Sequence, residues 1–474
     1  MIKVTSEADQ VWVAKATEAG QAHIFDGWED LSLDQQRGLM QQLQALDFQL
    51  IKHLLHQCFR SAADDGDRVV LKPPEVEPLP AQDSEEAAEY RRLGEEAIAA
   101  GKVAFVMVSG GASLGPLDEP TGFLPIGPVT GKSVFQLHAE KVRALNRRHR
   151  VSLHWWIVTR PEVDEQIHDY FRRENYFGLS GNDTVFYSQP LLPVVDRRGK
   201  FLLREPGKIA LEPNGHGGVF LEFLDQKRID RFRSRGIEHI FFFHVNNPLV
   251  KIGDPVFIGH HIASGSEVTS KAVVRAHPDE RLAVYCQMGG SPGVLEFSEF
   301  QDKSRNQVLA GGEPSFNYCD ATVHLLSLEF FQRLVRESVR LPFHARERTV
   351  PYLDKRGRLA RPTEPNCVQF RFFLFDALRV AKRATVLEVP RREEFSPIKN
   401  SGGQKSPQSA QKDLSCLFAR WLLDAGASFK NSGGDSGLLA LEISPLFALD
   451  EWELKQKIDL PLEIDQHLFL GSRT

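Results

Sequence analysis

Two stretches of this sequence contain residue types that could bind a phosphate group. The first is Ser109-Gly110-Gly111, which directly follows the six apolar residues Val103–Val108. Six consecutive apolar residues, four of them β-branched or aromatic, predict a strand that is buried on both faces. Glycines after such a strand let the backbone turn sharply and approach a ligand closely. This arrangement is typical of nucleotide binding in an α/β sheet, and it is equally typical of an ordinary tight turn.

The second stretch, Gly127–Ser133, reads Gly-Pro-Val-Thr-Gly-Lys-Ser and is similar to a P-loop. A P-loop needs four residues between its glycines and must directly follow a strand. This stretch is one residue short and lies far from the strand, and Pro128 removes one backbone N–H from the would-be phosphate site. We therefore do not interpret it as a P-loop. Ser133 with Gln136 instead predicts the start of a helix whose apolar face includes Phe135, Ala139 and Val142.

Composition limits the classes of protein to consider. The chain has 474 residues, which predicts two to four domains, and its 42% hydrophobic and 26% charged residues are ordinary for a soluble globular protein. The net charge of −5 argues against binding to nucleic acid or to an anionic membrane. No apolar run approaches the roughly 20 residues of a membrane span, and the first residues lack a signal-peptide pattern.

The cysteines indicate a reducing compartment. There are five, an odd number, and they are widely scattered without a Cys-x-x-Cys pair. This distribution argues against a disulfide framework and against a structural zinc site. We expect a cytoplasmic protein.

The predicted elements form three continuous parts. Residues 1–95 are predicted to be helical, because Ser32 and Gln35 form a capping box. Five leucines then keep one helix face through about four turns: Leu39, Leu43, Leu46, Leu50 and Leu54. A Pro-rich connector, 73–83, leads to a helix at 85–100.

Residues 96–385 alternate strands with helices, which predicts a mostly parallel, doubly wound α/β sheet. The predicted strands are 103–108, 153–158, 184–187, 208–211 and 240–245, with shorter hairpin-like strands at 272–275, 282–287 and 293–297. Residues 386–474 are predicted to form a small strand-rich domain, with a flexible loop near 400–412 and a helix at 414–425.

Seven separated stretches then match one family in order and spacing. They are Gly110-Gly111 with Gly131–Lys141, Gln189–Pro193, Pro213–Gly218, Val245–Lys251 with Asp254-Pro255, Val294–Glu299, Ser315–Asn317 and Glu394–Asn400. Glu442-Ile443-Ser444-Pro445 near the end also fits. Each stretch alone is a weak signal, but together they resemble the UDP-N-acetylhexosamine pyrophosphorylase branch of the UDP-sugar pyrophosphorylases.

This resemblance implies a Rossmann-like nucleotidyltransferase fold, with an N-terminal helical segment and a small C-terminal domain. It implies that UTP and a sugar 1-phosphate react to give a UDP-sugar and pyrophosphate, with Mg²⁺ as cofactor. In that reaction a sugar phosphate oxygen attacks the α-phosphorus in line, so the protein has to position two anions and neutralise developing charge.

The resemblance also implies roles for particular residues. The backbone of Ser109, Gly110 and Gly111 would hold the uridine and its phosphates. Gln189 would read the uracil edge through its amide, which both donates and accepts hydrogen bonds. Gly215 would let the backbone approach the base or ribose.

Four further residues would complete the site by the same resemblance. Glu296 would hydrogen-bond the sugar hydroxyls, and Asn317 would contact the N-acetyl or sugar region. Lys399 would place its ammonium on the phosphates as a point charge. Asn246 stands where the family has its metal-binding aspartate, and would offer Mg²⁺ an uncharged carbonyl oxygen.

The sequence departs from the family pattern at several positions that would handle charge. The glycine loop is two residues shorter and lacks its arginine, and Thr121 replaces the lysine of Pro-Lys-Gly. His216, which by its place in the motif would also be a nucleotide-binding residue, replaces an asparagine; we favour a neutral, hydrogen-bonding histidine there, with a cation as the alternative. One preorganised donor contributes about 3–4 kcal/mol to a transition state. Two hypotheses therefore stay open: an active uridylyltransferase, and a catalytically impaired homologue that binds a UDP-sugar or a partner.

Overall fold

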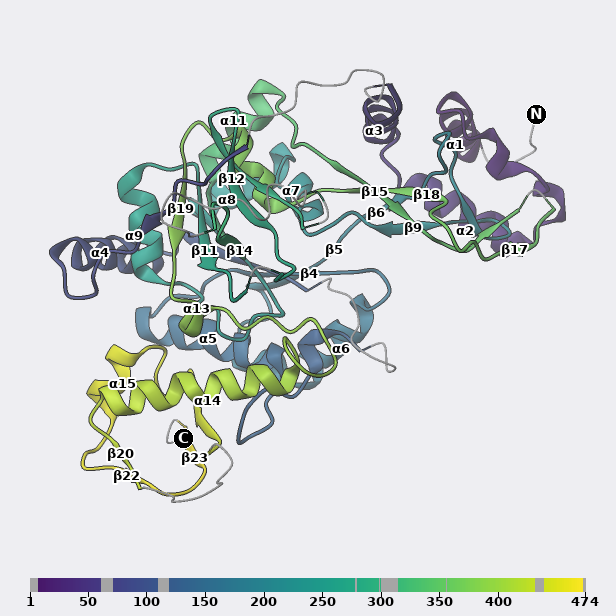
Figure 1. The fold of residues 1–474 in the computed structure, drawn as a ribbon. Helices are drawn as coiled ribbons and strands as arrows, with labels where there is room; N and C mark the ends of the chain where they lie inside the picture. Colours follow the sequence, from purple (N-terminus) through teal and green to yellow (C-terminus); the bar gives the residue numbers. More distant parts are fainter. Residues whose placement is uncertain are drawn as a thin grey trace. The chain divides into compact units, whose positions relative to one another are not determined.

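The computed structural model describes residues 7–60, 71–109, 119–277, 279–297, 299, 314–354, 356–430 and 439–471 (Figure 1). Contacts divide the chain into two units. The first comprises Met1–Val69, Gln189–Phe220 and Arg340–Leu374, and the second comprises Val70–Ser188, Leu221–Val339 and Phe375–Thr474. Both units combine segments that are separate in the sequence. The division into 1–95, 96–385 and 386–474 stays a prediction.

The second unit is built on a mixed, mostly parallel sheet with strand order β2-β19-β11-β14-β10-β3-β4-β5. In this order the strands are Glu77–Pro78, Ala384–Glu388, Val268–Val274, Tyr318–Ser327, His239–His244, Val103–Val108, Trp155–Thr159 and Thr184–Ser188. Only β14 runs antiparallel to its neighbours β10 and β11. The predicted α/β class is therefore confirmed, with one reversed strand in the middle of the sheet.

A hairpin and a short strand extend this sheet beside β14. Strands β12 (Val284–Met288) and β13 (Ser291–Leu295) pair antiparallel, and β1 (Leu71–Lys72) and β14 both pair with β12. The predicted hairpin-like strands at 282–287 and 293–297 correspond to β12 and β13. The predicted strand at 272–275 is the end of the longer β11.

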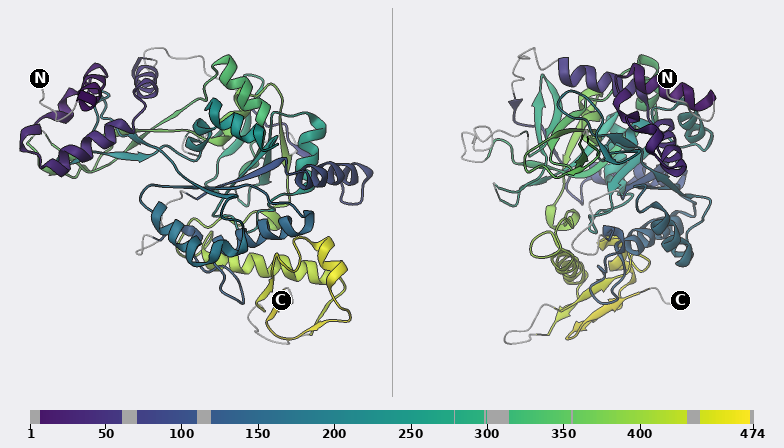
Figure 2. Two further views of the ribbon diagram at one scale, coloured as in Figure 1. Left: turned by 180° about the vertical axis from the view of Figure 1, so that it is seen from behind. Right: turned by 90° about the vertical axis from the view of Figure 1, so that its right-hand side faces the viewer.

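Helices cover both faces of the sheet (Figures 1 and 2). On one face, α5 (Val134–His149), α9 (Pro255–Ser264) and α14 (Pro407–Asp424) share a core with Phe105 and Phe241. On the other face, α8 (Gln226–Ser234) and α11 (Leu328–Glu337) pack aromatic rings around Phe223. Among the described residues, the remaining α-helices of this unit are α4 (Glu85–Ala99), α6 (Asp164–Arg173), α12 (Ala377–Val380), α13 (Arg391–Glu394) and α15 (Glu451–Lys457). Helix α7 (Gly218–Glu222) has residues in both units.

Helices α4 and α9 touch through glycines. A Cβ atom built on Gly94 would lie 2.0 Å from the carbonyl oxygen of Pro255. A Cβ atom built on Gly259 would lie 1.7 Å from the carbonyl oxygen of Tyr90. Both distances are far below van der Waals contact, so the two backbones approach each other only because these positions carry no side chain.

The C-terminal segment contains the predicted short strands, but its helix starts earlier than predicted. Strand β21 (Leu441–Ile443) pairs with β23 (Leu468–Leu470), and β20 (Ser428–Phe429) pairs with β22 (Glu463–Ile464). Helix α14 begins at Pro407, where Ser406 caps it and proline occupies its first turn. The prediction of a loop through residue 412 was therefore wrong after Ser406.

The first unit combines N-terminal helices with small hairpins. Among the described residues, its α-helices are α1 (Glu7–Glu18), α2 (Leu33–Gln44) and α3 (Phe48–Arg60). Two of its antiparallel strand pairs are β6 (Leu191–Pro193) with β9 (Leu211–Pro213) and β7 (Leu203–Glu205) with β8 (Lys208–Ile209). Two more are β15 (His344–Arg348) with β18 (Cys367–Arg371) and β16 (Tyr352–Leu353) with β17 (Leu359–Ala360). The predicted single leucine face is split between two helices. Asp47 accepts hydrogen bonds from the backbone N–H groups of Gln49 and Leu50 and so starts a new helix.

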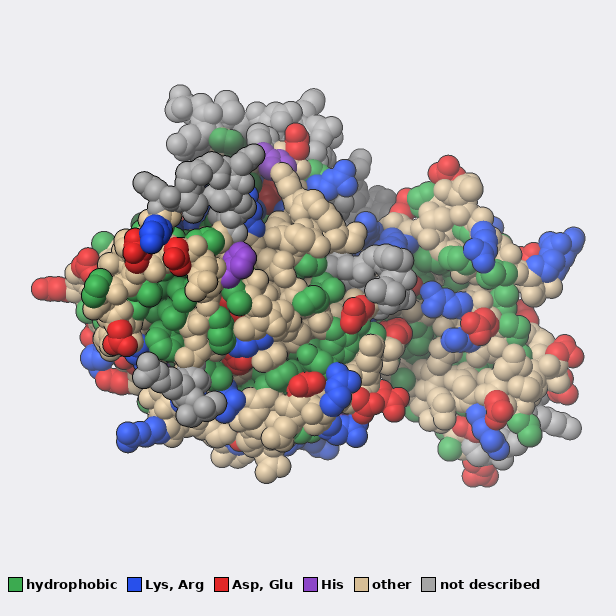
Figure 3. All heavy atoms as spheres, turned by 90° about the horizontal axis from the view of Figure 1, so that it is seen from below, with side chains coloured by type: hydrophobic (Ala, Val, Ile, Leu, Met, Phe, Trp, Pro, Cys, Tyr) green, Lys and Arg blue, Asp and Glu red, His purple; other side chains and the backbone are tan. Residues whose placement is uncertain are grey.

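Within the described residues, no helix is long and apolar enough to cross a bilayer. On the face drawn in Figure 3, the described Lys and Arg side chains are interspersed with Asp and Glu side chains. This mixture agrees with the small net charge of the chain.

Candidate nucleotide and phosphate site

The candidate site of the second unit lies at the carboxyl edge of strands β3 and β10. These strands run parallel and pair Val108 with His244. The backbone N–H of Val245 donates to Val108 (3.0 Å), and that of Ser109 donates to Val158 (2.8 Å). Ser109 and the residues after β10 therefore leave the sheet side by side. The predicted Gly110 and Gly111 lie outside the described residues.

The chain after β10 binds the segment that carries Lys399. The side chain of Asn247 donates to the carbonyl of Glu394 (2.7 Å) and accepts from the backbone N–H of Ser396 (3.0 Å). The N–H of Ile398 donates to the carbonyl of Asn246 (2.8 Å). Asn247 is almost fully buried, with 3% of its surface exposed. These three hydrogen bonds join two segments about 150 residues apart in the sequence and bring Lys399 to the end of β10.

Lys399 carries a positive charge whose pKa is shifted by its surroundings. It is exposed, and among the described residues its ammonium has no hydrogen-bond or ion-pair partner. Desolvation by the surrounding protein and the positive charge of Lys405 lower its pKa, while Asp320 and Glu280 oppose that shift. Burial and the charge of Lys399 lower the pKa of His244 to about 4, so His244 is neutral near pH 7. Lys399 is thus a positive charge without an ion pair among the described residues, although the carboxylates of Asp320 and Glu280 are near enough to act on its pKa.

The first unit brings Gln189, Asn214 and Gly215 together. The amide nitrogen of Gln189 donates to the side-chain oxygen of Asn214 and to the carbonyl of Gly215 (2.6 Å). Both partners are acceptors, so the hydrogen bonds fix the orientation of the Gln189 amide and direct its NH₂ group to them. Gly215 has a φ of +83°, and a Cβ atom there would lie 2.4 Å from the carbonyl oxygen of Phe372. Only glycine fits this position.

His216 lies in the same turn and contacts the segment 372–374. Its Nδ1 accepts a hydrogen bond from the backbone N–H of Leu374 (3.3 Å), and its ring lies 5.1 Å from the ring of Phe373. An Nδ1 atom that accepts a hydrogen bond carries no proton, so this contact favours the neutral histidine over the cation.

Glu296 and Asn317 lie farther along the sheet. Glu296 directly follows β13, whose Leu295 pairs with Val284, and Val284 also pairs with Cys319 of β14. This register places Glu296 and Asp320 on the same edge, two strands apart. Asn317 precedes β14, and its carbonyl accepts from the N–H of Arg275 (2.9 Å). The backbone hydrogen bonds therefore bring the chain at Asn246 and Lys399 together at the end of β10, and the register places Glu296 in line with Asp320, which acts on the charge of Lys399. The roles of Glu296 and Asn317 stay predictions.

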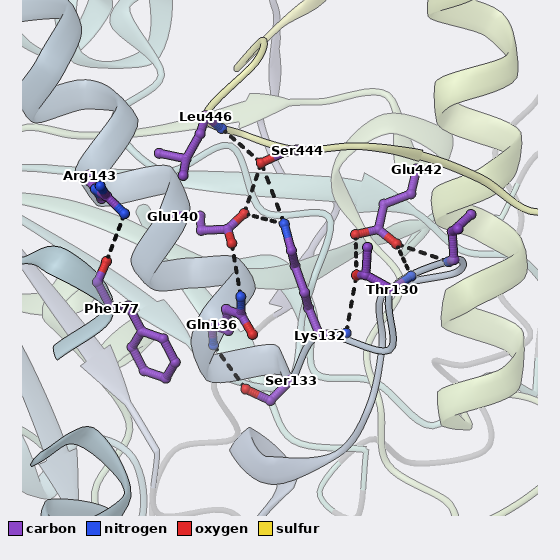
Figure 4. A network of polar contacts seen from close by, with 11 residues as sticks. Thr130, Lys132, Ser133, Gln136, Glu140, Arg143, Phe177, Glu442, Ser444 and Leu446 are labelled. Atoms are coloured by element: carbon purple, nitrogen blue, oxygen red, sulfur yellow. Dashed lines mark hydrogen bonds and ion pairs between the residues drawn. The ribbon is translucent and has the colours of Figure 1, made fainter. Parts of the chain in front are cut away.

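The P-loop-like stretch binds an anion from its own chain (Figure 4). The carboxylate of Glu442 accepts hydrogen bonds from the backbone N–H of Val129 (2.9 Å), from the N–H of Thr130 (2.8 Å) and from its hydroxyl (2.6 Å). Lys132 pairs with Glu140 (2.8 Å), and the hydroxyl of Ser444 donates to the same carboxylate oxygen (3.0 Å). This network attaches the Glu442–Ser444 segment to α5 and its preceding loop.

A cavity of about 400 Å³ in the second unit lies apart from this group. It is lined by α4, α5, α14 and the segments 248–256 and 443–452, and Ser109, Asn246 and Lys399 are not among its lining residues. In its wall, partly buried Lys141 donates to the carbonyls of Pro248 (2.6 Å) and Val250 (2.8 Å). Burial lowers the pKa of Lys141 to about 7. The cavity is therefore separate from the candidate phosphate site.

The sequence reasoning missed three residues of this neighbourhood: Asn247, Asp320 and Lys405. Asn247 was visible in Val245-Asn246-Asn247, but its partners lie about 150 residues away in the sequence. Asp320 gave no signal, because β14 was not predicted. Lys405 was assigned to a flexible loop on composition.

Comparisons with known proteins show which family this chain belongs to. Residues 52–415 match the family model described as UTP–glucose-1-phosphate uridylyltransferase. The chain is 32% identical to UDP-N-acetylhexosamine pyrophosphorylase-like protein 1 of Homo sapiens, over 89% of this chain and 87% of that protein. It is 32% identical to UDP-N-acetylglucosamine pyrophosphorylase of Saccharomyces cerevisiae, over 87% and 91%.

A solved structure extends the likeness to the fold. The uridine diphosphate N-acetylglucosamine pyrophosphorylase of Trypanosoma brucei, in complex with an inhibitor, matches with a TM-score of 0.82 and 23% identity. The match covers all of both chains. The family model and the relatives each extend over most of the sequence, and on that basis the chain belongs to the UTP–glucose-1-phosphate uridylyltransferase family.

Proposed function

We propose that this protein is a uridylyltransferase that converts UTP and a sugar 1-phosphate into a UDP-sugar and pyrophosphate. The observation that carries the proposal is Lys399, whose ammonium has no hydrogen-bond or ion-pair partner among the described residues and whose neighbour Ile398 donates its N–H to Asn246 just after β10. The family match supports the reaction class. The names of the similar proteins favour an N-acetylhexosamine 1-phosphate as the sugar substrate.

Gln189 suits recognition of the uracil base. Its NH₂ group is already used by Asn214 and Gly215, which leaves its carbonyl oxygen as the group that meets a ligand. The N3–H of uracil is a donor and matches this acceptor, whereas the corresponding atom of cytosine has no hydrogen. A fixed amide orientation therefore favours uridine over cytidine nucleotides.

The chemical step requires positioning and charge neutralisation. A phosphate oxygen of the sugar 1-phosphate attacks the α-phosphorus of UTP, and the bond from that phosphorus to the bridging oxygen of the β-phosphate breaks. Pyrophosphate leaves with the bonding electron pair. In this proposal the ammonium of Lys399 lies against the phosphates and stabilises the charge that develops on them. Asn247 acts through Lys399 by fixing the path of its backbone.

Mg²⁺ is the cofactor that the family resemblance implies. Within the described residues, no group of three or more His, Cys, Asp or Glu side chains is arranged to hold a metal ion. Mg²⁺ at phosphate-transfer sites is commonly bound by one or two carboxylates together with substrate phosphates. In this proposal the amide oxygen of Asn246 would contribute one neutral ligand in place of a carboxylate, and bound Mg²⁺ would neutralise triphosphate charge.

A second candidate function is binding of a UDP-sugar without turnover. Thr121, at the position of the family lysine, is 5% exposed and lies in a short 3₁₀ helix, η4 (Thr121–Phe123). A Cβ atom on its neighbour Gly122 would lie 2.2 Å from the ring of Phe135. This segment is tightly packed and supplies no cation, and Asn246 supplies no negative charge.

One assay separates the two functions. Pyrophosphate release is measured with Mg²⁺, UTP and a panel containing glucose 1-phosphate, N-acetylglucosamine 1-phosphate and N-acetylgalactosamine 1-phosphate. We expect release with an N-acetylhexosamine 1-phosphate. Calorimetry with UDP-N-acetylglucosamine is run in parallel: binding without release would support the second function, and the absence of both would contradict the two proposals together.

A further inference from the structure

The loop that carries Lys399 closes on a second lysine. The backbone N–H groups of Lys399 and Asn400 both donate to the carbonyl of Lys405, at 2.7 and 2.9 Å. The side chain of Asn400 donates to the carbonyl of Gln404 (2.7 Å), and the hydroxyl of Ser406 donates to Gly403 (2.7 Å). These bonds hold Lys399 and Lys405 across a tight turn.

Lys405 has an unusual backbone conformation. Its φ is +57°, in the left-handed region that side chains other than glycine and asparagine seldom adopt. Such strain persists where surrounding structure enforces it, and it concentrates at functional sites. Lys405 is the residue whose carbonyl closes the turn, so this backbone conformation belongs to the closed form of the loop that carries Lys399.

The side chain of Lys405 forms an ion pair with Glu280, but this carboxylate does not fully neutralise the charge of Lys405. Its ammonium lies 3.0 Å from a carboxylate oxygen of Glu280, and the guanidinium of Arg391 lies 2.6 Å from the same oxygen. Hydrogen bonds from Arg391, Lys405 and the N–H of Ala276 lower the pKa of buried Glu280 to about 2 against the cost of burial. One carboxylate therefore faces two cations, which leaves about one positive charge beside Lys399.

We propose that Lys405 and Lys399 together form a pyrophosphate-binding site, in which Lys405 supplies a second cation for the phosphates of UTP and for the pyrophosphate product. This inference rests on the proposed function and names a further residue that contacts the substrate. It also addresses the loss of charge at Thr121 and in the shortened glycine loop. Two ammonium groups repel each other unless an anion lies between them, and a diphosphate has the charge to do so.

The test compares Lys405→Met, which keeps the side-chain length without the charge, with Lys405→Arg, which keeps the charge. Lys412→Met, at an exposed lysine in α14, is the matched control. Calorimetry with Mg²⁺-pyrophosphate and the full-length chain needs no turnover. We expect Lys405→Met to bind pyrophosphate about 10- to 100-fold more weakly, the usual effect of losing one charged hydrogen bond. Lys405→Arg should largely restore binding, and Lys412→Met should bind like the wild type.

A pH profile adds a readout that a purely structural role would not change. The charged and titratable groups around Lys399 are Lys405, Asp320, Glu280, Cys319 and His244. Because Lys405 lowers the pKa of Lys399, its loss should move the alkaline limb of kcat/KM to higher pH. If Lys405 only balances Glu280, the double variant Glu280→Gln/Lys405→Met should regain pyrophosphate binding; we expect it to stay weak.

The outcomes separate this inference from the proposed function. Equal pyrophosphate affinity in the wild type and Lys405→Met, or recovery in the double variant, would overturn the role of Lys405. Absence of pyrophosphate binding by the wild type would also overturn it. Pyrophosphate binding with the expected Lys405→Met loss, but no turnover with any sugar phosphate, would support this inference and contradict the proposed transferase activity.

Discussion

Two loops of the second unit meet negative charge in opposite ways. The loop 127–132 resembles a phosphate-binding loop in sequence, yet its N–H groups bind the carboxylate of Glu442. The loop 399–405 has no P-loop pattern, yet it carries two lysines and follows Ile398, whose N–H donates to Asn246 just after β10. The N–H groups of loop 127–132 are therefore already bonded to a carboxylate of the same chain, whereas loop 399–405 carries more positive charge than the neighbouring carboxylates neutralise.

This difference shows that a sequence likeness to an anion site does not reveal which anion is bound. Backbone N–H groups donate hydrogen bonds to a carboxylate as readily as to a phosphate. The carboxylate of Glu442 belongs to the same chain as loop 127–132. Its effective concentration at the N–H groups of this loop is therefore high, and it competes there with any free phosphate. We infer that this loop attaches the C-terminal segment, while substrate phosphates go to loop 399–405. Four predictions test the comparison.

The largest effect is expected at Lys399. Replacing it with alanine removes the cation nearest to the proposed phosphates and should lower kcat/KM by about 10²–10³-fold or more. The measurement is a steady-state pyrophosphate-release assay, with Lys412→Ala as the control. Unchanged turnover in Lys399→Ala would mean that loop 399–405 is not the phosphate loop.

Asn247 should have the next largest effect. Asn247→Ala removes both side-chain hydrogen bonds that hold the Glu394–Ser396 segment, and we expect kcat to fall about 10- to 100-fold. Asn247→Asp keeps the acceptor for Ser396 and loses the donor to Glu394, so it should be intermediate. A loss of thermal stability without any loss of kcat would show that Asn247 does not position Lys399.

The alkaline pH limb gives a smaller, reversible effect. Lys399 must be protonated to bind phosphate, and its pKa is lowered. Activity should therefore fall as the pH rises through that value, below the ordinary lysine pKa of about 10.4. Between the lowered pKa of Lys399 in the folded chain and the ordinary lysine pKa, the unfolded chain binds more protons at this residue than the folded chain does. Through this group, the free energy of unfolding therefore increases as the pH rises across that range. A pH-rate profile with parallel circular dichroism should show activity lost while the fold persists.

The smallest effect on turnover is expected at Glu442. Glu442→Gln keeps the shape of the side chain but loses the charge that Val129 and Thr130 bind, and should destabilise folding by about 1–3 kcal/mol. Denaturant unfolding measures this loss. Since loop 127–132 has no proposed substrate role, kcat/KM at moderate temperature should change less than about twofold. A large rise in the KM for UTP would contradict the assignment.

The sequence predicted local structure best where one short stretch contains the whole signal. Val103–Val108 is the strand expected from its apolar run, and Ser133 caps α5 as its spacing with Gln136 indicates. The continuous leucine pattern concealed the break at Asp47, although aspartate is a common N-cap residue. Ser406-Pro407 likewise carries a helix-start signal that the Gly- and Ser-rich residues before it obscured.

Contacts between distant segments could not be predicted in the same way. The family resemblance supplied Lys399 and Gln189 as candidates, but the sequence contained no sign that Asn247 holds the backbone around Ser396. Nor did the sequence show that Glu442 binds the N–H groups of loop 127–132. A glutamate looks the same in a sequence whether its carboxylate forms a salt bridge, caps a loop or lies in solvent. Register across the reversed strand β14 depends on its pairing with β10 and β11, which no local pattern specifies.

The glycine contact between α4 and α9 has a consequence for protein engineering. Since each backbone occupies the space where the other would need a methyl group, Gly94 and Gly259 cannot exchange even for alanine without the helices separating. Saturation mutagenesis selected only for soluble expression should return glycine at both codons. Designers who stiffen helices by replacing glycine with alanine would therefore have to leave this pair untouched.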